Sequence, residues 1–458
     1  MTNYDLAVIG AGPGGYPAAI YASKLGLKVV CIEKGSVGGT CLNVGCIPSK
    51  TLLHFTDLFA QLVENEAIVK AQGAAIDFTA LQTHKQKVIA NLSASVAHLL
   101  SKNDVDFVAG KATLTSAHTI QVDDREITAK NILLATGSAP IALPFLPFDE
   151  KRVLSSTGAL HLSAVPTSMV VVGAGVIGVE LASVFQRLGT KVSCVELQPA
   201  VCSGLDLALS HGLLQALKKQ KIEFLLSTQV VSGKVSDKEV SLELKGASGE
   251  KIDCTSDVVL VAIGRRPATM DLGLEAVGVK IQKNDSIQVD GSFQTTVDSI
   301  YAIGDLIEGP MLAHRATEEG IAVCDLLAGK KTRIDYMSLP NVIYTFPECA
   351  TVGLTEEEVK KTERPYKVAT AYLKGNPRAF ACGYQEGFVK VIADGKTDAL
   401  VGMHILSPQA SEMIAIGMVA ISQKMKVGEL ALLPFPHPTL SEAIKEACLQ
   451  IEKRAIHS

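Results

Sequence analysis

The sequence predicts an α/β protein of several domains, and three observations lead to this prediction. First, 458 residues are too many for one hydrophobic core, so about three domains are expected. Second, one pattern of strand, glycine-rich turn, helix and strand occurs twice, near the N-terminus and again from residue 168. Third, this pattern ends before about residue 335, where strands of another type are followed by helical runs.

The first copy of the pattern is YDLAVIGAGPGGYPAAIYASKLGLKVVCIEK. It consists of an apolar strand, a glycine turn, a helical stretch and a second strand that ends in an acid. The turn and the terminal acid supply five candidate residues: Gly10, Gly12, Gly14, Gly15 and Glu33. Such glycines let a helix N-terminus approach a pyrophosphate, and the terminal carboxylate accepts hydrogen bonds from ribose hydroxyls. The segment therefore predicts a Rossmann-like dinucleotide-binding domain.

The second copy is SMVVVGAGVIGVELASVFQRLGTKVSCVELQ, with candidate residues Gly173, Gly175, Gly178 and Glu196. In both copies the first glycine and the terminal acid are 23 positions apart. A single motif of this kind could be a βαβ unit with glycines for packing, but two complete copies indicate two dinucleotide sites, and hydride transfer between two cofactors. Glu196 would repel a 2′-phosphate and the following LQPA offers no arginine, which favours NAD over NADP.

Three later strand ends extend these sites. The segments NILLATGSAP (131–140) and DVVLVAIGRRP (257–267) are apolar strands that end in glycine, as expected for loops that close over a nucleotide. In 299–321 an apolar strand ends at Gly304-Asp305, and a helix begins near Leu312. Asp305 could cap that helix or bind a polyol hydroxyl of a cofactor.

The C-terminal part predicts an α+β domain. FVKVIAD and LVGMHILS are typical of antiparallel strands, and SEMIAIGMVAISQKM and SEAIKEACLQIEKRA of helices. Their apolar surface makes this part a candidate dimerisation domain.

Composition excludes several function classes. The formal charge is −4 and no long block of Lys or Arg occurs, which gives nucleic-acid binding no support. The longest apolar stretch, 169–179, has 11 residues, too few to span a bilayer. Three residues precede the first strand, so we expect no signal peptide. Ten cysteines are too sparse for a secreted disulfide framework, which favours a reducing compartment and a cytoplasmic location.

Two cysteines stand close together in GGTCLNVGCIPSK, at positions 41 and 46. In a continuous helix their Cα atoms would be roughly 8–9 Å apart, outside the disulfide range of about 4.4–6.8 Å. A disulfide therefore requires irregular backbone at Cys41, which Gly38, Gly39 and Gly45 permit. A helix N-terminus would stabilise a thiolate at Cys46. Two structural thiols remain the alternative, and zinc is disfavoured because no second pair of ligands has suitable spacing.

Taken together, the motifs resemble one family over essentially the whole chain: GAGPGGY, GGTCLNVGCIPSK, ATGS, GAGVIGVE, AIGDLIEGPMLAH, GMHILSP and HPTLSEA. This family is the flavin-dependent pyridine-nucleotide–disulfide oxidoreductases, and the similarity is to its members that oxidise dihydrolipoyl groups. The resemblance implies a homodimer with an FAD-binding domain (1–145), an NAD-binding domain (146–265), a central domain completing the FAD site (266–334) and an interface domain (335–458).

The resemblance also implies the cofactor contacts. FAD would bind at the first glycine turn and Glu33, with Thr40, Lys50, Gly110, Thr136, Gly137, Ser138, Asp305, Met311, Leu312, Ala313 and His314. NAD would bind at the second turn and Glu196, with Val176, Ile177, Glu180, Val230 and Gly264.

Five catalytic residues are implied in the same way: Cys41, Cys46, Lys50, His437 and Glu442. A dithiol must lose protons before it attacks a disulfide, and His437, oriented by Glu442, is the family's base. Without the resemblance, a single histidine would more often be a surface or capping residue. Lys50 would pair with Glu180 beside the flavin, where a cation stabilises the reduced ring; alternatively, both are surface charges.

The implied activity is oxidation of protein-bound dihydrolipoyl groups with reduction of NAD+, and the implied partner is a lipoylated carrier domain of a 2-oxoacid dehydrogenase or glycine cleavage complex. Glutathione reductases are an alternative, but they carry an NADP-selective arginine set and a tyrosine at the position of Val176. Mercuric reductases carry C-terminal vicinal cysteines, whereas the last cysteine here is Cys448. A non-catalytic flavoprotein subunit is the alternative from another class.

Overall fold

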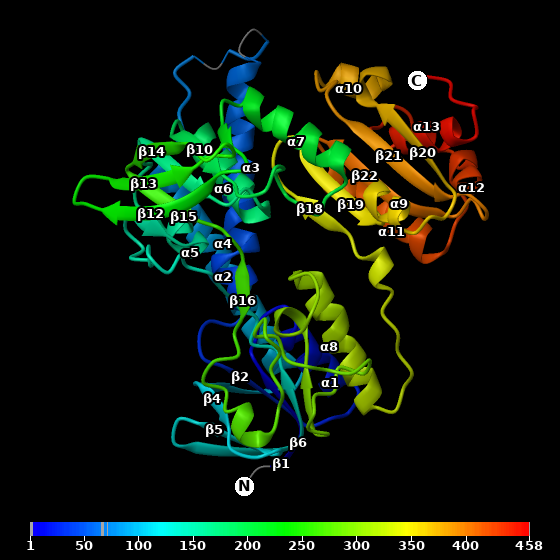
Figure 1. The fold of residues 1–458 in the computed structure, drawn as a ribbon. Helices are drawn as coiled ribbons and strands as arrows, with labels where there is room; N and C mark the ends of the chain where they lie inside the picture. The colour runs from blue at the N-terminus through cyan, green and yellow to red at the C-terminus, as the bar shows by residue number, and fades with distance from the viewer. Residues whose placement is uncertain (1–2, 66–67, 71, 458) are drawn as a thin grey trace.

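The computed structural model describes residues 3–65, 68–70 and 72–457 and consists of three bodies (Figure 1). The first body contains the N-terminus and lies at the bottom of Figure 1. Its sheet has the order β3-β2-β1-β6-β5-β4, and β17 pairs with the C-terminal residues of β6. These strands are β1 (Asn3–Ile9), β2 (Val29–Glu33), β3 (Asp106–Ala109), β4 (Ala112–Leu114), β5 (Thr119–Val122), β6 (Arg125–Leu134) and β17 (Ile300–Ala302).

Apolar sequence runs account for the centre of this sheet. Leu6, Ala7 and Val8 of β1 are fully buried, as expected for a parallel strand covered on both faces. The helices α1 (Gly15–Lys24) and α8 (Ala313–Leu327) pack side by side on the sheet, although almost 300 residues separate them. The first body therefore combines residues from two separate ranges, 1–145 and 266–334, which the family resemblance assigns to the FAD site.

The second body is an insertion into the first. The chain leaves through β7 (Ser138–Pro140) and returns through β16 (Arg265–Pro267), and these two strands pair antiparallel. The returning chain adds β17 parallel to β6. The bounds of the four domains predicted from the sequence stay a prediction. The connectivity explains how a central segment can complete the first nucleotide site.

A parallel sheet of order β11-β10-β9-β15-β8 forms the second body. Its strands are β8 (Val153–Leu154), β9 (Ser168–Val172), β10 (Lys191–Val195), β11 (Glu223–Leu225) and β15 (Val258–Val261), and its helices are α5 (Ser156–Leu160), α6 (Val176–Arg187) and α7 (Leu207–Lys219). An antiparallel sheet of β12 (Gln229–Val235), β13 (Val240–Lys245) and β14 (Lys251–Ser256) lies beside it. The units β1-α1-β2 and β9-α6-β10 correspond, which confirms the predicted repeat.

The third body is the predicted α+β domain. Its antiparallel sheet has the order β18-β19-β22-β21-β20, with strands β18 (Asn341–Ile343), β19 (Glu348–Gly353), β20 (Tyr366–Tyr372), β21 (Phe388–Asp394) and β22 (Leu400–Ser407). The accompanying helices are α9 (Glu356–Lys361), α10 (Pro377–Ala381), α11 (Ala410–Ser422), α12 (Val427–Leu432) and α13 (Glu442–Ile451). The sequence predicted the pair β21–β22 and the two longer helices, and the fold class is confirmed.

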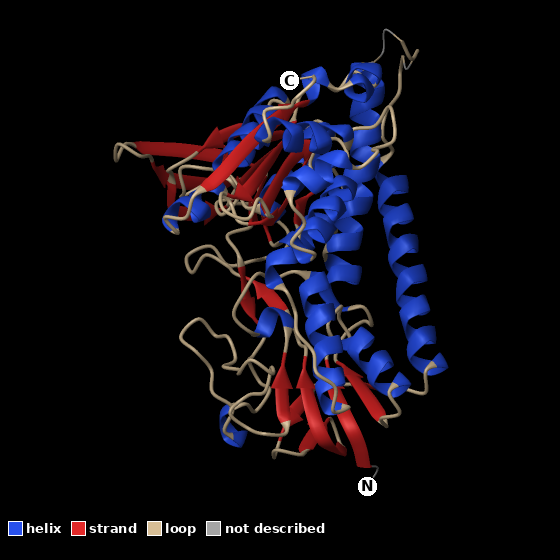
Figure 2. Ribbon diagram, turned by 90° about the vertical axis from the view of Figure 1, so that its right-hand side faces the viewer, coloured by secondary structure: helices blue, strands red, loops and turns tan. Residues whose placement is uncertain are grey.

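Two long helices join the lower and upper bodies, α3 (Cys46–Glu64) and α4 (Phe78–Lys102) (Figure 2). A short helix, α2 (Gly39–Val44), precedes them, and α3 packs against α6 of the second body. Leu52 and Leu53 of α3 are buried in the core of that body. The helix that begins at Cys46 therefore connects the two nucleotide folds. None of the helices in the described ranges has the length and apolar character needed to cross a membrane.

Candidate active site

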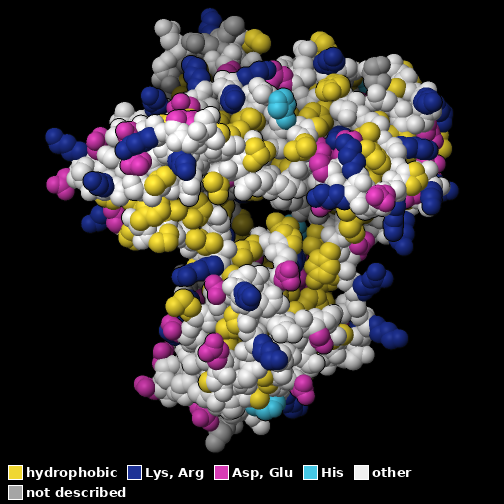
Figure 3. Space-filling view, viewed as in Figure 1, with side chains coloured by type: hydrophobic (Ala, Val, Ile, Leu, Met, Phe, Trp, Pro, Cys, Tyr) yellow, Lys and Arg dark blue, Asp and Glu magenta, His cyan; other side chains and the backbone are white. Residues whose placement is uncertain are grey.

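A cavity of about 1870 Å³ lies where the three bodies meet. Figure 3 shows a hollow at this place, with hydrophobic side chains around it. The cavity is lined by the glycine turns of both nucleotide folds, by Cys41 and Cys46, and by residues of α11. Pockets for one ligand usually measure about 300–1,000 Å³. The volume is therefore sufficient for two dinucleotides.

The acids at the ends of β2 and β10 are held in the same way. Glu33 accepts hydrogen bonds from the backbone N–H groups of Ala11 and Gly35, at 2.7 and 2.8 Å. Glu196 accepts the corresponding two bonds in the second fold, also at 2.7 and 2.8 Å. Each carboxylate is thus fixed beside its glycine turn, and its remaining lone pairs are available to ribose hydroxyls.

All but two of the predicted cofactor residues line this cavity. The two exceptions among the described residues are Gly15 and Gly178. A Cβ atom at Gly15 would lie 1.8 Å from the carbonyl oxygen of Gly10, and one at Gly178 would lie 2.0 Å from that of Gly173. These glycines therefore let the helix pack against the turn, and the cofactor contacts predicted for them stay a prediction.

The backbone between the two cysteines differs from the prediction. Irregular backbone was expected at Cys41, but Cys41 lies within α2 and the break falls at Gly45, with φ −139° and ψ −110°. The sequence argument assumed one continuous helix, whereas two helices meet here. A Cβ at Gly45 would lie only 3.2 Å from the Cα of Cys41. Glycine at this position therefore allows Cys46, the first residue of α3, to approach Cys41.

The two cysteines are free thiols whose pKa values shift in opposite directions. The pKa of Cys46 is lowered to about 7 by the hydrogen bond that Cys41 donates and, against the effect of burial, by the charge of Lys50. The hydrogen bond to Cys46 and burial raise the pKa of Cys41 far above its usual range. Near neutral pH the pair therefore holds its negative charge on Cys46.

Lys50 pairs with Glu180 in the wall of the cavity. The ammonium lies 2.8 and 3.0 Å from the two carboxylate oxygens, and the Glu180 side chain is only 4% exposed. Tyr344 of the third body donates its backbone N–H to the same carboxylate at 3.0 Å, and its ring centroid is 4.6 Å from the Lys50 nitrogen. Burial opposes the charged form of Lys50, but Glu180 raises its pKa, so Lys50 remains a cation. Sequence reasoning missed Tyr344.

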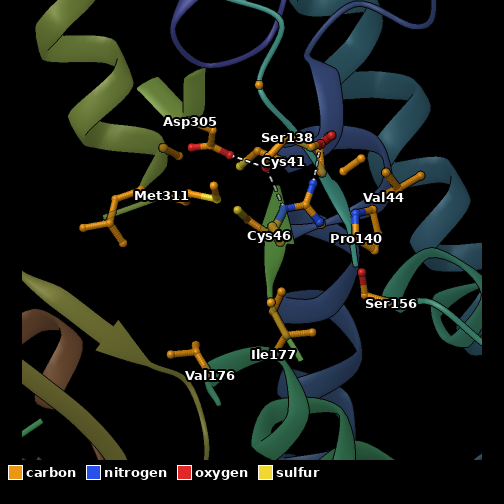
Figure 4. A pocket seen from close by; sticks show the side chains of 18 of the residues that line it. Cys41, Val44, Cys46, Ser138, Pro140, Ser156, Val176, Ile177, Asp305 and Met311 are labelled. Atoms are coloured by element: carbon orange, nitrogen blue, oxygen red, sulfur yellow. Dashed lines mark hydrogen bonds between the residues drawn. The ribbon is translucent and has the colours of Figure 1, made fainter. Parts of the chain in front are cut away.

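Asp305 belongs to a second polar group beside the cysteines (Figure 4). Its carboxylate accepts a hydrogen bond from the Ser138 hydroxyl at 2.5 Å. Arg265 donates from Nε to the same hydroxyl and from Nη2 to the Ser138 carbonyl, both at 2.7 Å. Sequence reasoning also missed Arg265, although the arginine pair directly after the strand-end Gly264 was a usable signal.

His437 and Glu442 form the predicted pair, with Nδ1 2.9 Å from the carboxylate. Burial opposes the ionised carboxylate, but the Thr439 N–H and His437 lower the pKa of Glu442. The His437 side chain is 66% exposed, and neither residue is among the described residues that line the cavity. One chain therefore does not bring this base to its own cysteines.

The cavity joins two dinucleotide folds to a thiol pair with split pKa values, an arrangement that defines a nucleotide-dependent disulfide oxidoreductase. The family model described as pyridine nucleotide-disulphide oxidoreductase matches residues 4–320, and the model of its dimerisation domain matches 339–448. The chain belongs to this family.

Named relatives cover nearly the whole chain. Dihydrolipoyl dehydrogenase of Trypanosoma brucei brucei is 44% identical over 99% of this chain and 98% of its own. Dihydrolipoyl dehydrogenase 2, mitochondrial, of Arabidopsis thaliana is 43% identical over 99% and 91%. Among solved structures, LpdA from Mycobacterium tuberculosis superposes with a TM-score of 0.90 at 26% identity, covering 98% and 100%.

Members of this family use FAD and NAD(H), and the residues of the cavity fit both. Each glycine turn leaves space that a side chain would fill. A Cβ built at Gly12 would touch only the Cα of Gly39, at 3.8 Å, and a Cβ built at Gly175 would meet no atom within 4 Å. Asp305 and the two strand-end acids provide oxygen acceptors for hydroxyl groups. Within the described ranges, no cluster of three or more His, Cys, Asp or Glu side chains is arranged to hold a metal ion.

Proposed function

We propose that this protein oxidises protein-bound dihydrolipoyl groups to lipoyl groups and reduces NAD+ to NADH. The observation that carries this proposal is the Cys41–Cys46 pair at the meeting point of the two nucleotide folds. Relatives named dihydrolipoyl dehydrogenase, at 42–44% identity over nearly the full chain, support the choice of substrate.

The split pKa values determine how a Cys41–Cys46 disulfide would react. A substrate thiolate attacks the Cys41 sulfur, a bond forms to it, and Cys46 leaves as a thiolate. Cys46 is the better leaving group because its pKa is lowered to about 7. The second substrate sulfur then attacks the first, closing the lipoyl disulfide and releasing Cys41, which takes up a proton. The two electrons of the substrate are then held by the cysteine pair.

Bound FAD would supply the means to pass this electron pair to NAD+ as a hydride. Glu33, Asp305 and the 311–314 turn would hold the FAD, and Glu196 would hold the NAD+ ribose. Lys50, fixed by Glu180, would place positive charge beside Cys46. The choice of NAD+ over NADP+ is supported by the Glu196 carboxylate, which would repel a 2′-phosphate.

The base for the substrate thiols would be His437 of a second subunit. The dimerisation-domain match supports a homodimer, and the exposed His437 lies in that domain. A twofold interface would give two equivalent sites, each with cysteines from one subunit and His437 from the other. The physiological substrate would be a lipoyl group on the carrier domain of a 2-oxoacid dehydrogenase or glycine cleavage complex.

NADH formation from dihydrolipoamide and NAD+ tests this proposal. We expect turnover with NAD+, much weaker turnover with NADP+, and no reduction of glutathione disulfide with either reduced nucleotide. A flavoprotein that binds FAD but produces no NADH from dihydrolipoamide would contradict the proposal and favour a non-catalytic subunit. Reduction of glutathione disulfide by NADPH would instead favour the glutathione reductase alternative.

A further inference from the structure

Residues 336–344, here named the connecting segment, lead from the first body into the sheet of the third body. The segment begins with the 3-10 turn η3 (Tyr336–Ser338) and includes β18. Pro340 and Tyr344 contact residues that line the cofactor cavity, His314 and Glu180. Tyr336 contacts Glu319, which lies on α8 behind the lining. None of these three residues of the segment has a role in the reaction described above.

Tyr336 contacts a buried ion pair of α8. Its hydroxyl donates to Glu319 at 2.9 Å, and the centroid of its ring lies 5.8 Å from the Arg315 guanidinium carbon. Arg315 and Glu319 pair at 2.7 Å with side chains 2% and 0% exposed. Tyr336 thus supplies one of the few partners of a charged pair that has almost no contact with solvent.

This ion pair fixes both ends of the loop before α8. Glu319 accepts the N–H of Gly304 at 2.7 Å, directly before Asp305. Arg315 donates to the carbonyl oxygens of Glu308 and Pro310 at 2.6 and 2.9 Å. The loop between these points carries Asp305 and leads into the 311–314 turn. Its backbone geometry therefore depends on Arg315 and Glu319.

Pro340 in the middle of the connecting segment and Tyr344 at its end make two further contacts with residues of the site. The Pro340 carbonyl lies 2.9 Å from Nε2 of His314, at the end of the same turn. Tyr344 contacts the Lys50–Glu180 pair: its ring lies over Lys50, and its backbone N–H donates to Glu180. Only the ring contact depends on the tyrosine side chain. One short segment therefore places a tyrosine ring beside two ion pairs: Lys50–Glu180 in the cavity wall, and Arg315–Glu319 behind the loop that carries Asp305.

We propose that the connecting segment is a positioning element for the reaction: Tyr336 orients the loop that holds FAD, and Tyr344 orients Lys50 beside Cys46. The first half rests on the proposed assignment of Asp305 and the 311–314 turn to FAD. Through this segment the third body, which carries the dimerisation domain, sets the geometry of the redox site within its own chain.

Tyr336→Phe and Tyr344→Leu in the full-length holoprotein test the two halves separately. The chain offers a matched control in Tyr4, whose hydroxyl donates to Asp106 at 2.8 Å and whose ring lies 5.2 Å from the Lys28 nitrogen. Tyr4 lies away from the cavity, so Tyr4→Phe measures the effect on FAD binding of losing a similar hydrogen bond elsewhere. Because Tyr4 is more buried than Tyr336, at 8% against 48% exposed, the effect of this loss on folding should be at least as large.

For Tyr336→Phe we measure the FAD dissociation constant by reconstituting the apoprotein, a readout that does not depend on the substrate. Loss of a hydrogen bond to a charged group should raise this constant about tenfold. The KM for NAD+ should stay within about twofold, and Tyr4→Phe should change neither. An FAD dissociation constant raised no more than in Tyr4→Phe would overturn the first half. Failure of the unchanged protein to oxidise dihydrolipoamide would contradict the proposed function and would leave this test of FAD binding unaffected.

For Tyr344→Leu we expect FAD to stay bound, kcat to fall roughly fivefold, and the long-wavelength absorption of the dithiol-reduced protein to weaken. Tyr344→Phe keeps the ring over Lys50 and should restore both values. An unchanged absorption and kcat in Tyr344→Leu would overturn the second half, as would a Tyr344→Phe protein as impaired as Tyr344→Leu.

Discussion

The ammonium of Lys50 lies 2.8 Å from the Glu180 carboxylate, and this ion pair joins the helix that begins at Cys46 to the helix of the second glycine turn. Lys50 is one helical turn after Cys46, so its charge acts on the thiol that carries the negative charge. The pair therefore connects the redox centre electrostatically with the NAD-binding fold.

Replacing Lys50 with Met should raise the pKa of Cys46 above about 7, because the positive charge of Lys50 lowers it. The thiolate would then form at higher pH, and kcat near neutral pH should fall at least about tenfold. Titrating the long-wavelength absorption of the dithiol-reduced protein against pH measures this shift. A midpoint equal to that of the unchanged protein would contradict the proposed role of Lys50.

Cys46→Ser should bind FAD but should not be reduced by one equivalent of dithiol, because no disulfide can form. Cys41→Ser is the matched variant: it also lacks a disulfide, but its Cys46 thiolate should give the long-wavelength absorption without added dithiol. Absorption spectra with and without dihydrolipoamide distinguish the two. Normal reduction of the flavin in Cys46→Ser would show that electrons do not pass through this pair.

Glu196→Ala should raise the KM for NAD+ and narrow the preference over NADP+. Hydrogen bonds from ribose hydroxyls to a charged acceptor contribute roughly 1.5–3 kcal/mol each, so an increase of at least about tenfold is expected. Glu33→Ala removes the equivalent acid of the other fold and should weaken FAD binding while leaving the KM for NAD+ unchanged. If Glu196→Ala keeps the original nucleotide preference, another residue selects NAD+.

The buried His404 should make the folded protein less stable at acidic pH. It is fully buried between the second and third bodies, 2.6 Å from the Thr351 hydroxyl and 3.9 Å from Asp206, which itself pairs with Lys390. Burial lowers the pKa of His404, although Asp206 opposes this effect. Because the unfolded chain binds the proton more tightly, stability should fall as the pH drops below about 6.5.

His404→Gln removes this proton uptake and should reduce the loss of Tm between about pH 7 and pH 5. The control is His437→Gln, which replaces an exposed histidine. Calorimetry on the FAD-loaded protein provides the measurement. Equal pH dependence in the two variants would mean that other groups cause the acid sensitivity.

Local patterns predicted much of this architecture. The glycine spacing before Glu33 and Glu196 predicted both turns, because a strand, a tight turn and a helix are specified by neighbouring residues. The buried strands β21 and β22 followed from apolar runs bounded by polar residues. His437 and Glu442 are five positions apart, so their contact was also within reach of the sequence.

Contacts between distant segments could not be predicted in this way. Tyr344 reaches Lys50 across almost 300 residues, and no local pattern distinguishes it from the other tyrosines. The break at Gly45 was misplaced because the spacing of the cysteines was compared with one continuous helix. The packing role of Gly15 and Gly178 was also not predicted, since motif spacing does not distinguish glycines that pack from glycines that face a ligand.

We propose that each working site combines Cys41 and Cys46 of one subunit with His437 of the other. Cys46→Ser and His437→Ala homodimers should each be nearly inactive with dihydrolipoamide and NAD+. Unfolding both and refolding them together in equal amounts should give mixed dimers in half of the molecules, each with one intact site. Because half of the dimers would have one intact site of two, we expect recovery of about a quarter of the unchanged protein's activity. Confirmed mixed dimers without recovered activity would contradict a site shared between two subunits.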